Sequence, residues 1–233
     1  MQVKLHRDGQ AKFIEKPFAF ILDQPQGSII AGYTKTGLRG DPERDIPLSL
    51  SFTGKDFGVA YMEQVHGSNI KSIDKPGSYE CDGLFTGRGG IALVVKTADC
   101  MPILMYSKKE GMIGAIHMEW RSAKEGILDN IGYDLSSFSC IAGVGMRKCC
   151  YEVGEEFRDY DGVGLFLEQR PGSYYFDPVA FIREKLTRRG LCGDNFFDIG
   201  ICSVCSGQGF FSHRRDGTSG RTLSFIAKHR ETL

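Results

Sequence analysis

Three nearly continuous apolar runs in the middle of the chain constrain its fold more than any other feature. They cover residues 91–96, 101–106 and 111–117. None approaches the ~18 apolar residues that a membrane-spanning helix needs. Short runs without polar alternation are typical of strands in a sheet that is covered on both faces. We therefore expect a layered core built around these three strands.

The flanking segments predict a mixture of strands and helices. Further strands are expected at 18–22, 28–33, 48–52 and 196–202, and helices at 122–135 and 152–160. A third helix is expected to follow Asp177 as N-cap, with Pro178 at its first position, and to end at Gly190. Because the elements do not alternate strictly, an α+β fold is favoured over a doubly wound α/β fold. Without repeats or linkers, residues 1–233 are expected to form one domain.

Composition limits the classes of function. Of the 233 residues 41% are hydrophobic, and 29 basic side chains balance 29 acidic ones. The chain therefore has no excess positive charge that would attract it to nucleic acid or to an anionic membrane surface. The N-terminus has no signal-peptide pattern, so a cytoplasmic location is expected. Eight cysteines are sparse for this length, and most are expected to be reduced.

Three metal-binding residue types end strand-like runs. These are His66, Cys100 and His117, and gaps of 34 and 17 residues separate them. Two imidazoles and a thiolate are ligands of a catalytic zinc that keeps one position open, and the long gaps exclude a zinc finger. Taken singly, each residue has a structural alternative, a buried thiol or a hydrogen-bonded ring. Asp99, beside Cys100, needs a partner or solvent for its carboxylate.

A second unusual cluster lies near the C-terminus. In residues 210–221, His213, Arg214, Arg215 and Arg221 are interleaved with glycines. Arginine forks bind phosphate or carboxylate groups in bidentate fashion, so the cluster suggests an anion site. The alternative is a solvated, ion-paired loop. A nucleic-acid surface is disfavoured because the chain has no basic excess.

The remaining cysteine motifs do not predict a second metal site. Cys149 and Cys150 are adjacent, and two side chains from neighbouring residues do not easily reach one tetrahedral ion. Cys202 and Cys205 form a CxxC motif without a second such pair. A redox role for this motif is also disfavoured because it opens no βαβ unit.

Six motifs occur in an order that resembles one known family. They are QVHG at 64–67, CDGLFT at 81–86, ADCMP at 98–102, HMEWRS at 117–122, CCYEVG at 149–154 and FFSHRRDGTSGR at 210–221. The chain resembles the laccase-domain family, also called YfiH-like or multicopper polyphenol oxidases and now regarded as purine nucleoside phosphorylases. The resemblance covers most of the chain from Gln64 onward.

The resemblance implies a single-domain α/β/β/α layered fold with mixed sheets. It implies that His66, Cys100 and His117 bind one zinc, and we place these three residues together with Asp99 in the expected catalytic group. The implied reaction is phosphate-dependent cleavage of purine nucleosides such as adenosine and inosine, accompanied by adenosine deamination. The implied partners are therefore a purine nucleoside and phosphate. Copper chemistry ranks lower, because one thiolate/imidazole site has neither the axial Met of blue copper nor a multicopper cluster.

The phosphate is expected to bind basic side chains. Those that we assign to this role are Arg121, Lys35, Arg214, Arg215 and Arg221. For deamination, Asp99 or Glu119 is expected to carry the proton.

Two segments depart from the family pattern. Met118 and Glu119 replace a small Ala-Gly pair. If the strand continued, Glu119 would share a face with His117 and approach the metal or its water. Residues 34–38 and 48–52 lack a Gly, a Ser and an Asn of the pattern, which suggests an altered substrate preference.

Two rival functions remain. Cys100 activated by His117 would give a Cys–His hydrolase or amidase without metal. The departures near Lys35 and Ser49 would also fit a non-catalytic scaffold that keeps the fold. Metal content and turnover distinguish these two functions from zinc-dependent nucleoside chemistry, which is the preferred interpretation. The sequence does not indicate an oligomeric state.

Overall fold

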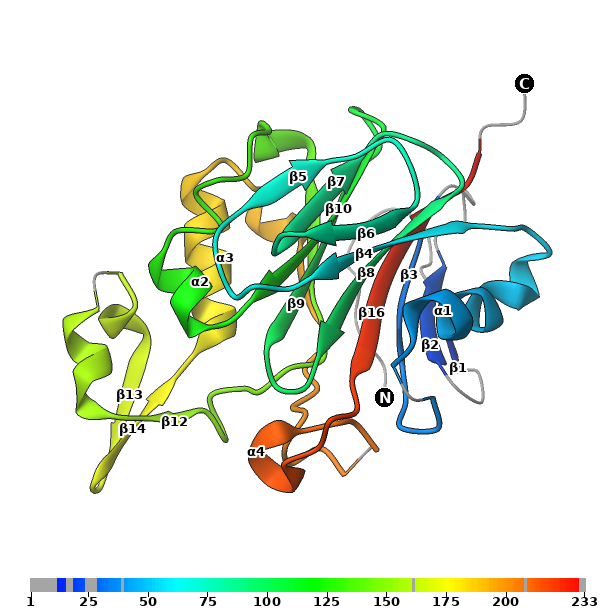
Figure 1. Ribbon diagram of the computed structural model, residues 1–233. Helices are drawn as coiled ribbons and strands as arrows, with labels where there is room; N and C mark the ends of the chain where they lie inside the picture. The colour runs from blue at the N-terminus through cyan, green and yellow to red at the C-terminus, as the bar shows by residue number, and fades with distance from the viewer. Residues whose placement is uncertain are drawn as a thin grey trace.

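A computed structural model describes residues 12–15, 19–23, 29–38, 40–160, 162–207 and 209–230. Two stacked mixed sheets dominate this part of the chain (Figure 1). The first sheet has seven strands, in the order β1 (Lys12–Glu15), β2 (Ala19–Asp23), β3 (Ile29–Thr34), β16 (Thr222–Lys228), β8 (Ile91–Thr97), β4 (Gly58–Glu63) and β6 (Gly77–Glu80).

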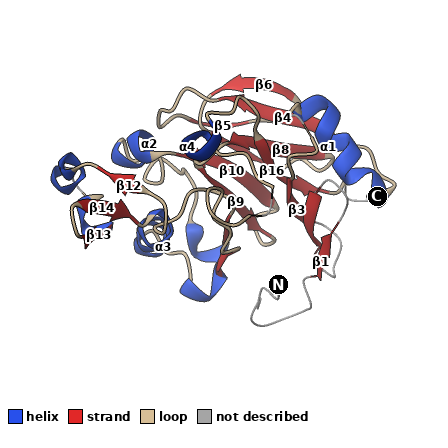
Figure 2. Cartoon of the chain, turned by 90° about the horizontal axis from the view of Figure 1, so that it is seen from below, coloured by secondary structure: helices blue, strands red, loops and turns tan. Residues whose placement is uncertain are grey.

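The second sheet has six strands. Their order is β15 (Phe196–Asp198), β11 (Ser139–Ala142), β9 (Met101–Ser107), β10 (Met112–Met118), β7 (Gly83–Thr86) and β5 (Ile70–Ser72). A small third sheet, β12 (Glu152–Val153), β14 (Ser173–Phe176) and β13 (Leu167–Arg170), projects to one side in both views (Figures 1 and 2).

Helices cover the outer faces of the two large sheets. Helix α1 (Pro42–Leu50) packs on the seven-stranded sheet, and α2 (Trp120–Lys124) and α3 (Pro178–Arg188) lie on the six-stranded sheet. The short α4 (His213–Asp216) precedes β16. Short 3₁₀ helices occupy Ser51–Thr53, Leu135–Ser137, Glu155–Asp159, Gly164–Phe166 and Gly193–Asn195.

The two-faced burial explains why the central strands are apolar throughout. On β8, Leu93 and Val95 join the core between the two sheets, whereas Ala92 and Val94 pack with Ile46 of α1. A strand buried on both faces leaves no position for a polar side chain. The resulting order of layers is helix, sheet, sheet, helix, which confirms the expected mixed α+β sandwich.

Several predicted elements are confirmed. The three apolar runs form β8, β9 and β10, and the early runs form β2 and β3, although residues 18 and 28 lie outside the described residues. Asp177 caps α3 by accepting the Ala180 N–H at 3.0 Å, and Gly190 follows its end with a φ of 97°.

The strand predicted at 48–52 is wrong. Helix α1 and a 3₁₀ turn occupy that segment. Asp41 caps the helix by accepting the N–H groups of Glu43 and Arg44, and Pro42 takes the first turn. Asp45, fully buried, also accepts the backbone N–H groups of residues 40 and 41. These local signals outweigh the strand propensity of the apolar residues.

Two predicted helices are also wrong in extent or type. The helix expected at 122–135 ends at Lys124, because Gly126 turns the chain with a φ of 77°. The apolar residues that follow Lys124 still lie in the core, but they reach it from turns and not from a continuous helix. The helix expected at 152–160 is a short strand followed by a 3₁₀ helix, with Gly154 between them.

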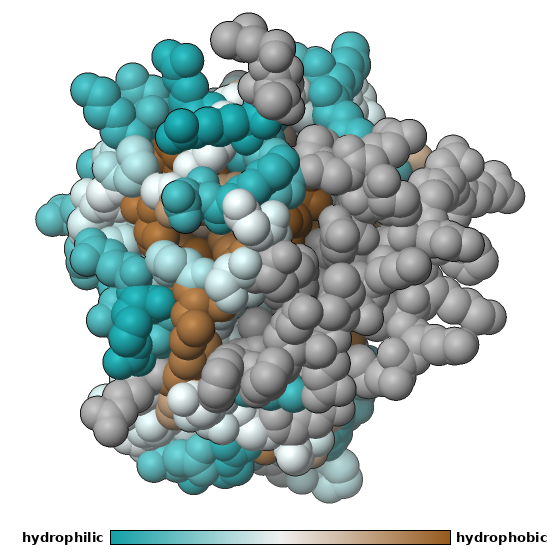
Figure 3. All heavy atoms as spheres, turned by 90° about the vertical axis from the view of Figure 1, so that its right-hand side faces the viewer, coloured by the Kyte–Doolittle hydropathy of each residue, from teal (hydrophilic) through white to brown (hydrophobic). Residues whose placement is uncertain are grey.

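The side of the molecule that carries α1 shows a band of apolar surface between hydrophilic regions (Figure 3). Among the described residues, no helix is long and apolar enough to cross a membrane.

Candidate metal centre

Three strand ends bring the predicted ligands together. His66 lies in the loop between β4 and β5, Cys100 directly precedes β9, and His117 lies near the end of β10. One ligand atom from each lies within 4.8 Å of the other two. The two imidazole rings meet edge to face, with centroids 5.0 Å apart. The geometry therefore assembles a thiolate and two imidazoles from segments far apart in sequence.

Asp82, between β6 and β7, organises this group. Its Oδ1 lies 2.8 Å from His117 Nδ1 and also accepts the His66 N–H, while Oδ2 accepts the N–H groups of Val65 and Gly67. One fully buried carboxylate thus fixes both the loop that carries His66 and the ring of His117. With Nδ1 hydrogen-bonded, His117 presents Nε2 to the other two ligands, which is the usual carboxylate–histidine arrangement behind a metal.

The electrostatics favour an ionised Asp82, which accepts a hydrogen bond, beside a neutral His117, which donates it through Nδ1. Burial opposes ionisation of Asp82, but the His117 ring and the N–H groups of Gly67 and His66 outweigh it and lower its pKa. Burial lowers the pKa of His117 despite the attraction of Asp82. A neutral imidazole beside an ionised carboxylate is the state that a metal ligand requires. Sequence reasoning missed Asp82, although the CDGLFT motif contained it.

Gln64 attaches the same loop to the seven-stranded sheet. Its side-chain Nε2 donates to the carbonyl of Lys96 at 2.8 Å, and its Oε1 accepts the Lys96 N–H at 2.8 Å. The amide group thereby ties the residue that follows β4 to the backbone of β8. Both ends of the ligand loop are held before any ion binds.

Backbone strain is concentrated at the centre. Among the described residues, the non-glycine residues with positive φ are His66, at 61°, and Asp99, at 91°. Such conformations cost roughly 1–3 kcal/mol, persist only where surrounding contacts impose them, and cluster at functional sites. One is a predicted ligand and the other immediately precedes Cys100.

The surroundings of Cys100 favour its protonated thiol form. Burial, followed by the carboxylates of Glu119 and Asp99, raises its pKa to about 12, while Arg221 opposes the shift. Reactive cysteine nucleophiles have lowered pKa values. This environment therefore disfavours a metal-free thiolate nucleophile and suits a thiol that ionises on binding a metal.

Asp99 performs a structural task at this point. Its carboxylate accepts the Ser203 hydroxyl and the Arg214 N–H, each at 2.7 Å, and its carbonyl accepts the Met146 N–H. Both oxygens are therefore engaged by the loops that surround Cys100. The role of Asp99 as proton carrier stays a prediction.

Glu119 does not continue β10, which ends at Met118. It is the N-cap of α2, and its Oε1 accepts the N–H groups of Arg121 and Ser122. Ser122 completes a reciprocal capping box. Although buried, Glu119 does not belong to the group of mutually close ligand atoms. Its negative charge still acts on Cys100. Glu119 caps α2 through Oε1 because the strand stops one residue earlier than expected, and its approach to a metal stays a prediction.

The predicted phosphate-binding arginines differ in what they contact. Arg215 directs all five of its N–H donors at protein acceptors, namely the carbonyls of Ser203, Val204 and Phe210 and the carboxylate of Asp216. It has no donor left for an anion, so we assign it the structural role of holding the turn at 203–204.

Arg221 and Arg214 remain available in part. Arg221 donates through Nη1 to the carbonyls of Thr218 and Gly220, and its charge lowers the pKa of Cys100 against the opposing effects. Arg214 donates through both Nη atoms to the carbonyl of Glu152 at 3.3 Å. Arg221 is thus the predicted cation whose charge reaches Cys100.

The other two predicted cations are less directly connected to the centre. The Arg121 guanidinium lies over the Trp120 ring, 4.9 Å from its centroid, on the exposed start of α2. Lys35 follows β3, where the next residue, Thr36, donates its N–H to the carbonyl of Gly209. This bond joins the Lys35 loop to the segment that leads into the arginine cluster.

The donor set fits a zinc ion in chemical terms. Two imidazoles and one thiolate form a set that catalytic zinc sites use, with a further position for a substrate or water. The buried His117 has its outer nitrogen bonded to a carboxylate, as the ligands of such sites require.

Sequence comparison identifies the family. The family model described as "Multi-copper polyphenol oxidoreductase laccase" matches residues 45–229, so the chain belongs to this laccase-domain family. A purine nucleoside phosphorylase from Xylella fastidiosa strain Temecula1 is 33% identical over an alignment of 214 residues that covers 82% of this chain and 82% of its own. A purine nucleoside phosphorylase from Aquifex aeolicus is 31% identical over 75% of this chain and 84% of its own.

Solved structures share the fold. YlmD from Geobacillus stearothermophilus superposes with a TM-score of 0.80 at 24% identity, over 95% of this chain and 100% of its own. The hypothetical protein YfiH from Bacillus licheniformis also gives a TM-score of 0.80, at 20% identity, over 92% of this chain and 97% of its own. These likenesses show the α+β sandwich of the family.

Proposed function

We propose that this protein is a zinc-dependent purine nucleoside phosphorylase that acts on adenosine- or inosine-type nucleosides, with adenosine deamination as a companion reaction. The observation that carries the proposal is the convergence of His66, Cys100 and His117 within 4.8 Å. The curated relatives at about 30% identity are named purine nucleoside phosphorylases, which supports the substrate class.

The overall reaction balances without a redox partner. The bond between the ribose C1′ and the purine nitrogen breaks, and a phosphate oxygen forms the new bond to C1′. The base leaves with a proton on its nitrogen, and the other product is ribose 1-phosphate. Bound at the centre, zinc would supply Lewis-acid polarisation of an oxygen. The chain supplies the rest, which is orientation, charge and exclusion of water.

Arg221 is the residue that we assign to phosphate binding. Its charge reaches Cys100, and among the described residues its Nε and Nη2 have no hydrogen-bond partner. A guanidinium that keeps two donors on one side can hold two oxygens of a phosphate. Arg214 and Lys35 are secondary candidates on neighbouring segments, and Arg121 is the most peripheral.

The remaining alternatives are weaker on specific grounds. A Cys–His hydrolase would need Cys100 as thiolate, whereas its surroundings raise its pKa to about 12. Polyphenol oxidation by several coppers would need more ligand groups than the described residues gather around this centre. A scaffold without activity would not require strain at both His66 and Asp99.

The test is metal analysis combined with nucleoside turnover. In Cys100→Ala we expect zinc to be lost from this centre and phosphorolysis of inosine to fall more than ~100-fold, since even changes to residues that only hydrogen-bond the ligands cost about 10–100-fold at metal sites. Cys192→Ala is the matched control, because Cys192 is exposed and outside the ligand group. Arg221→Gln should raise the KM for phosphate more than that for inosine.

Several outcomes would contradict the proposal. Full activity of Cys100→Ala would exclude Cys100 from the chemistry. Turnover by metal-free wild type that ends on alkylation of Cys100 would support the cysteine hydrolase instead. An Arg121→Ala variant with an unchanged KM for phosphate would remove that residue from the anion site.

A further inference from the structure

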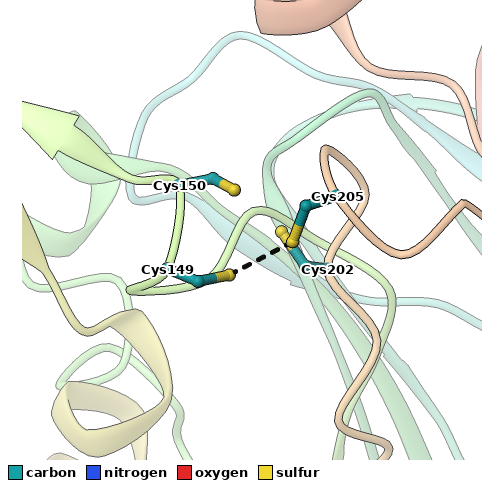
Figure 4. Close-up of side chains that lie close together, drawn as sticks. All are labelled: Cys149, Cys150, Cys202 and Cys205. Carbon is teal, nitrogen blue, oxygen red and sulfur yellow. Dashed lines mark hydrogen bonds between the residues drawn. The ribbon is translucent and has the colours of Figure 1, made fainter.

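A second group of potential ligands lies apart from the first. Cys149, Cys150, Cys202 and Cys205 each place Sγ within 4.8 Å of the other three (Figure 4). The sequence alone predicted no metal site here, because adjacent cysteines seemed unable to share one ion. The turn at 148–150 overcomes this objection by directing both side chains toward the CxxC segment.

The spacing of the sulfurs suits a shared ion rather than a disulfide. Cys149 Sγ and Cys205 Sγ are 3.5 Å apart. Sulfurs of a tetrahedral zinc site are about 3.8 Å apart, as follows from zinc–sulfur bonds of ~2.3 Å. A disulfide requires ~2.05 Å. Four sulfurs gathered at one point exceed what a single disulfide can use.

Two backbone turns are shaped around the buried member of the group. The Cys202 sulfur accepts hydrogen bonds from the N–H groups of Cys205, Val204 and Arg147. Backbone N–H groups from both segments therefore point at one sulfur, which is the environment of a thiolate.

Nearby cations offset the charge that four thiolates would bring. The charge of Arg215 interacts with Cys202, and its Nη1 holds the carbonyls of Ser203 and Val204 within the CxxC turn. An open hollow of ≈ 580 Å³ is lined by Cys149, Cys202 and Cys205, together with charged residues such as Arg147 and Lys148. Solvent on this side gives an ion a route to the sulfurs.

We propose that Cys149, Cys150, Cys202 and Cys205 bind a second, structural zinc ion as a tetrathiolate site. Tetrahedral S₄ ligation with all four positions filled by protein is typical of structural zinc. The ion would join the segment before β12 to the segment after β15, which already touch through a parallel bridge between Gly145 and Cys202.

The second site is connected to the first through Asp99. Ser203, inside the CxxC turn, donates its hydroxyl to Asp99, and the Met146 N–H donates to the Asp99 carbonyl. Asp99 immediately precedes Cys100. The structural ion would therefore fix the two segments that hold the strained backbone next to a ligand of the first centre. It supports that centre by position and takes no part in its chemistry.

Zinc stoichiometry tests the proposal. Wild type should contain about two zinc ions per chain, and Cys149→Ser and Cys205→Ser should each lower this to about one while the other centre keeps its ion. Cys192→Ser, an exposed cysteine outside both groups, should keep about two. Cys100→Ala should lose the other ion only, so failure of this proposal is distinguishable from failure of the proposed function.

X-ray absorption of zinc in the wild type provides a readout that does not depend on folding of the variants. One sulfur at the first centre and four at the second average to about 2.5 sulfurs per zinc. A single site with His66, Cys100 and His117 would give about one. An average near one, a zinc content of one that Cys149→Ser leaves unchanged, or a Cys149–Cys205 disulfide in purified protein would overturn the proposal.

Discussion

At the scale of single residues, Asp82 contributes more to the first centre than its sequence context suggests. One carboxylate accepts three backbone N–H groups and contacts an imidazole nitrogen. It fixes the ligand loop and the orientation of the His117 ring together. An outer-shell residue with two such tasks is expected to control metal affinity without touching the ion.

Replacing Asp82 with Asn tests this role. An amide cannot accept from all of these donors, and its NH₂ group would face an N–H. We expect zinc affinity to fall about 10–100-fold, measured by competition with a chromogenic chelator. Asp134→Asn is the control, since Asp134 is an exposed carboxylate that caps the turn at Leu135–Ser137. An unchanged zinc affinity in Asp82→Asn would show that the loop at 64–67 keeps its conformation without the Asp82 carboxylate.

At the scale of elements, the change from β10 to α2 determines which residues reach the centre. The strand delivers His117 and ends at Met118, and the next residue, Glu119, caps the helix. A sequence pattern gives the alternation of side chains along a strand but not the residue at which the strand stops. The capping box with Ser122 is the local signal that marks this boundary.

Glu119→Ala separates capping from metal binding. Loss of an N-cap costs about 1 kcal/mol of stability, so the midpoint of denaturant unfolding should fall while zinc content is unchanged. Ser122→Ala removes the other half of the same capping box and should behave alike. If Glu119→Ala lost zinc while Ser122→Ala kept it, the carboxylate would act on the ion directly.

The elements that the sequence predicted well are those with a strong and local cause. Strands β8 to β10 follow from apolar continuity, and α3 follows from Asp177 and Gly190. The convergence of the four cysteines was not predictable, because it depends on a bridge between Gly145 and Cys202, 57 residues apart in the numbering. The role of Asp82 likewise arises only from tertiary contacts.

At the scale of the whole molecule, the core between the two sheets holds the strand ends in place. Leu93 lies fully buried in this core. Both large sheets contribute strands whose ends carry site residues, so their packing sets the relative positions of β8 and β10. Stability of the sandwich and geometry of the centre are therefore linked.

A matched pair of leucines measures this packing. Leu93→Ala should lower the free energy of unfolding by about 2–5 kcal/mol, because it removes buried methyl groups and leaves a cavity. Leu165→Ala should change it by no more than ~0.5 kcal/mol, because Leu165 is 79% exposed. Denaturant unfolding of the two variants gives both values. Equal effects would mean that the space between the sheets closes around the smaller side chain.

The three ligands of the first centre differ in their exposure, and this has a kinetic consequence. His117 is 1% exposed, Cys100 is intermediate and His66 is exposed. An incoming or departing ion must therefore pass on the His66 side, so the rate of metal exchange depends on how often the 64–67 loop detaches from Asp82. Occupancy in a metal-poor cell would then be governed by the opening of one short loop as well as by affinity.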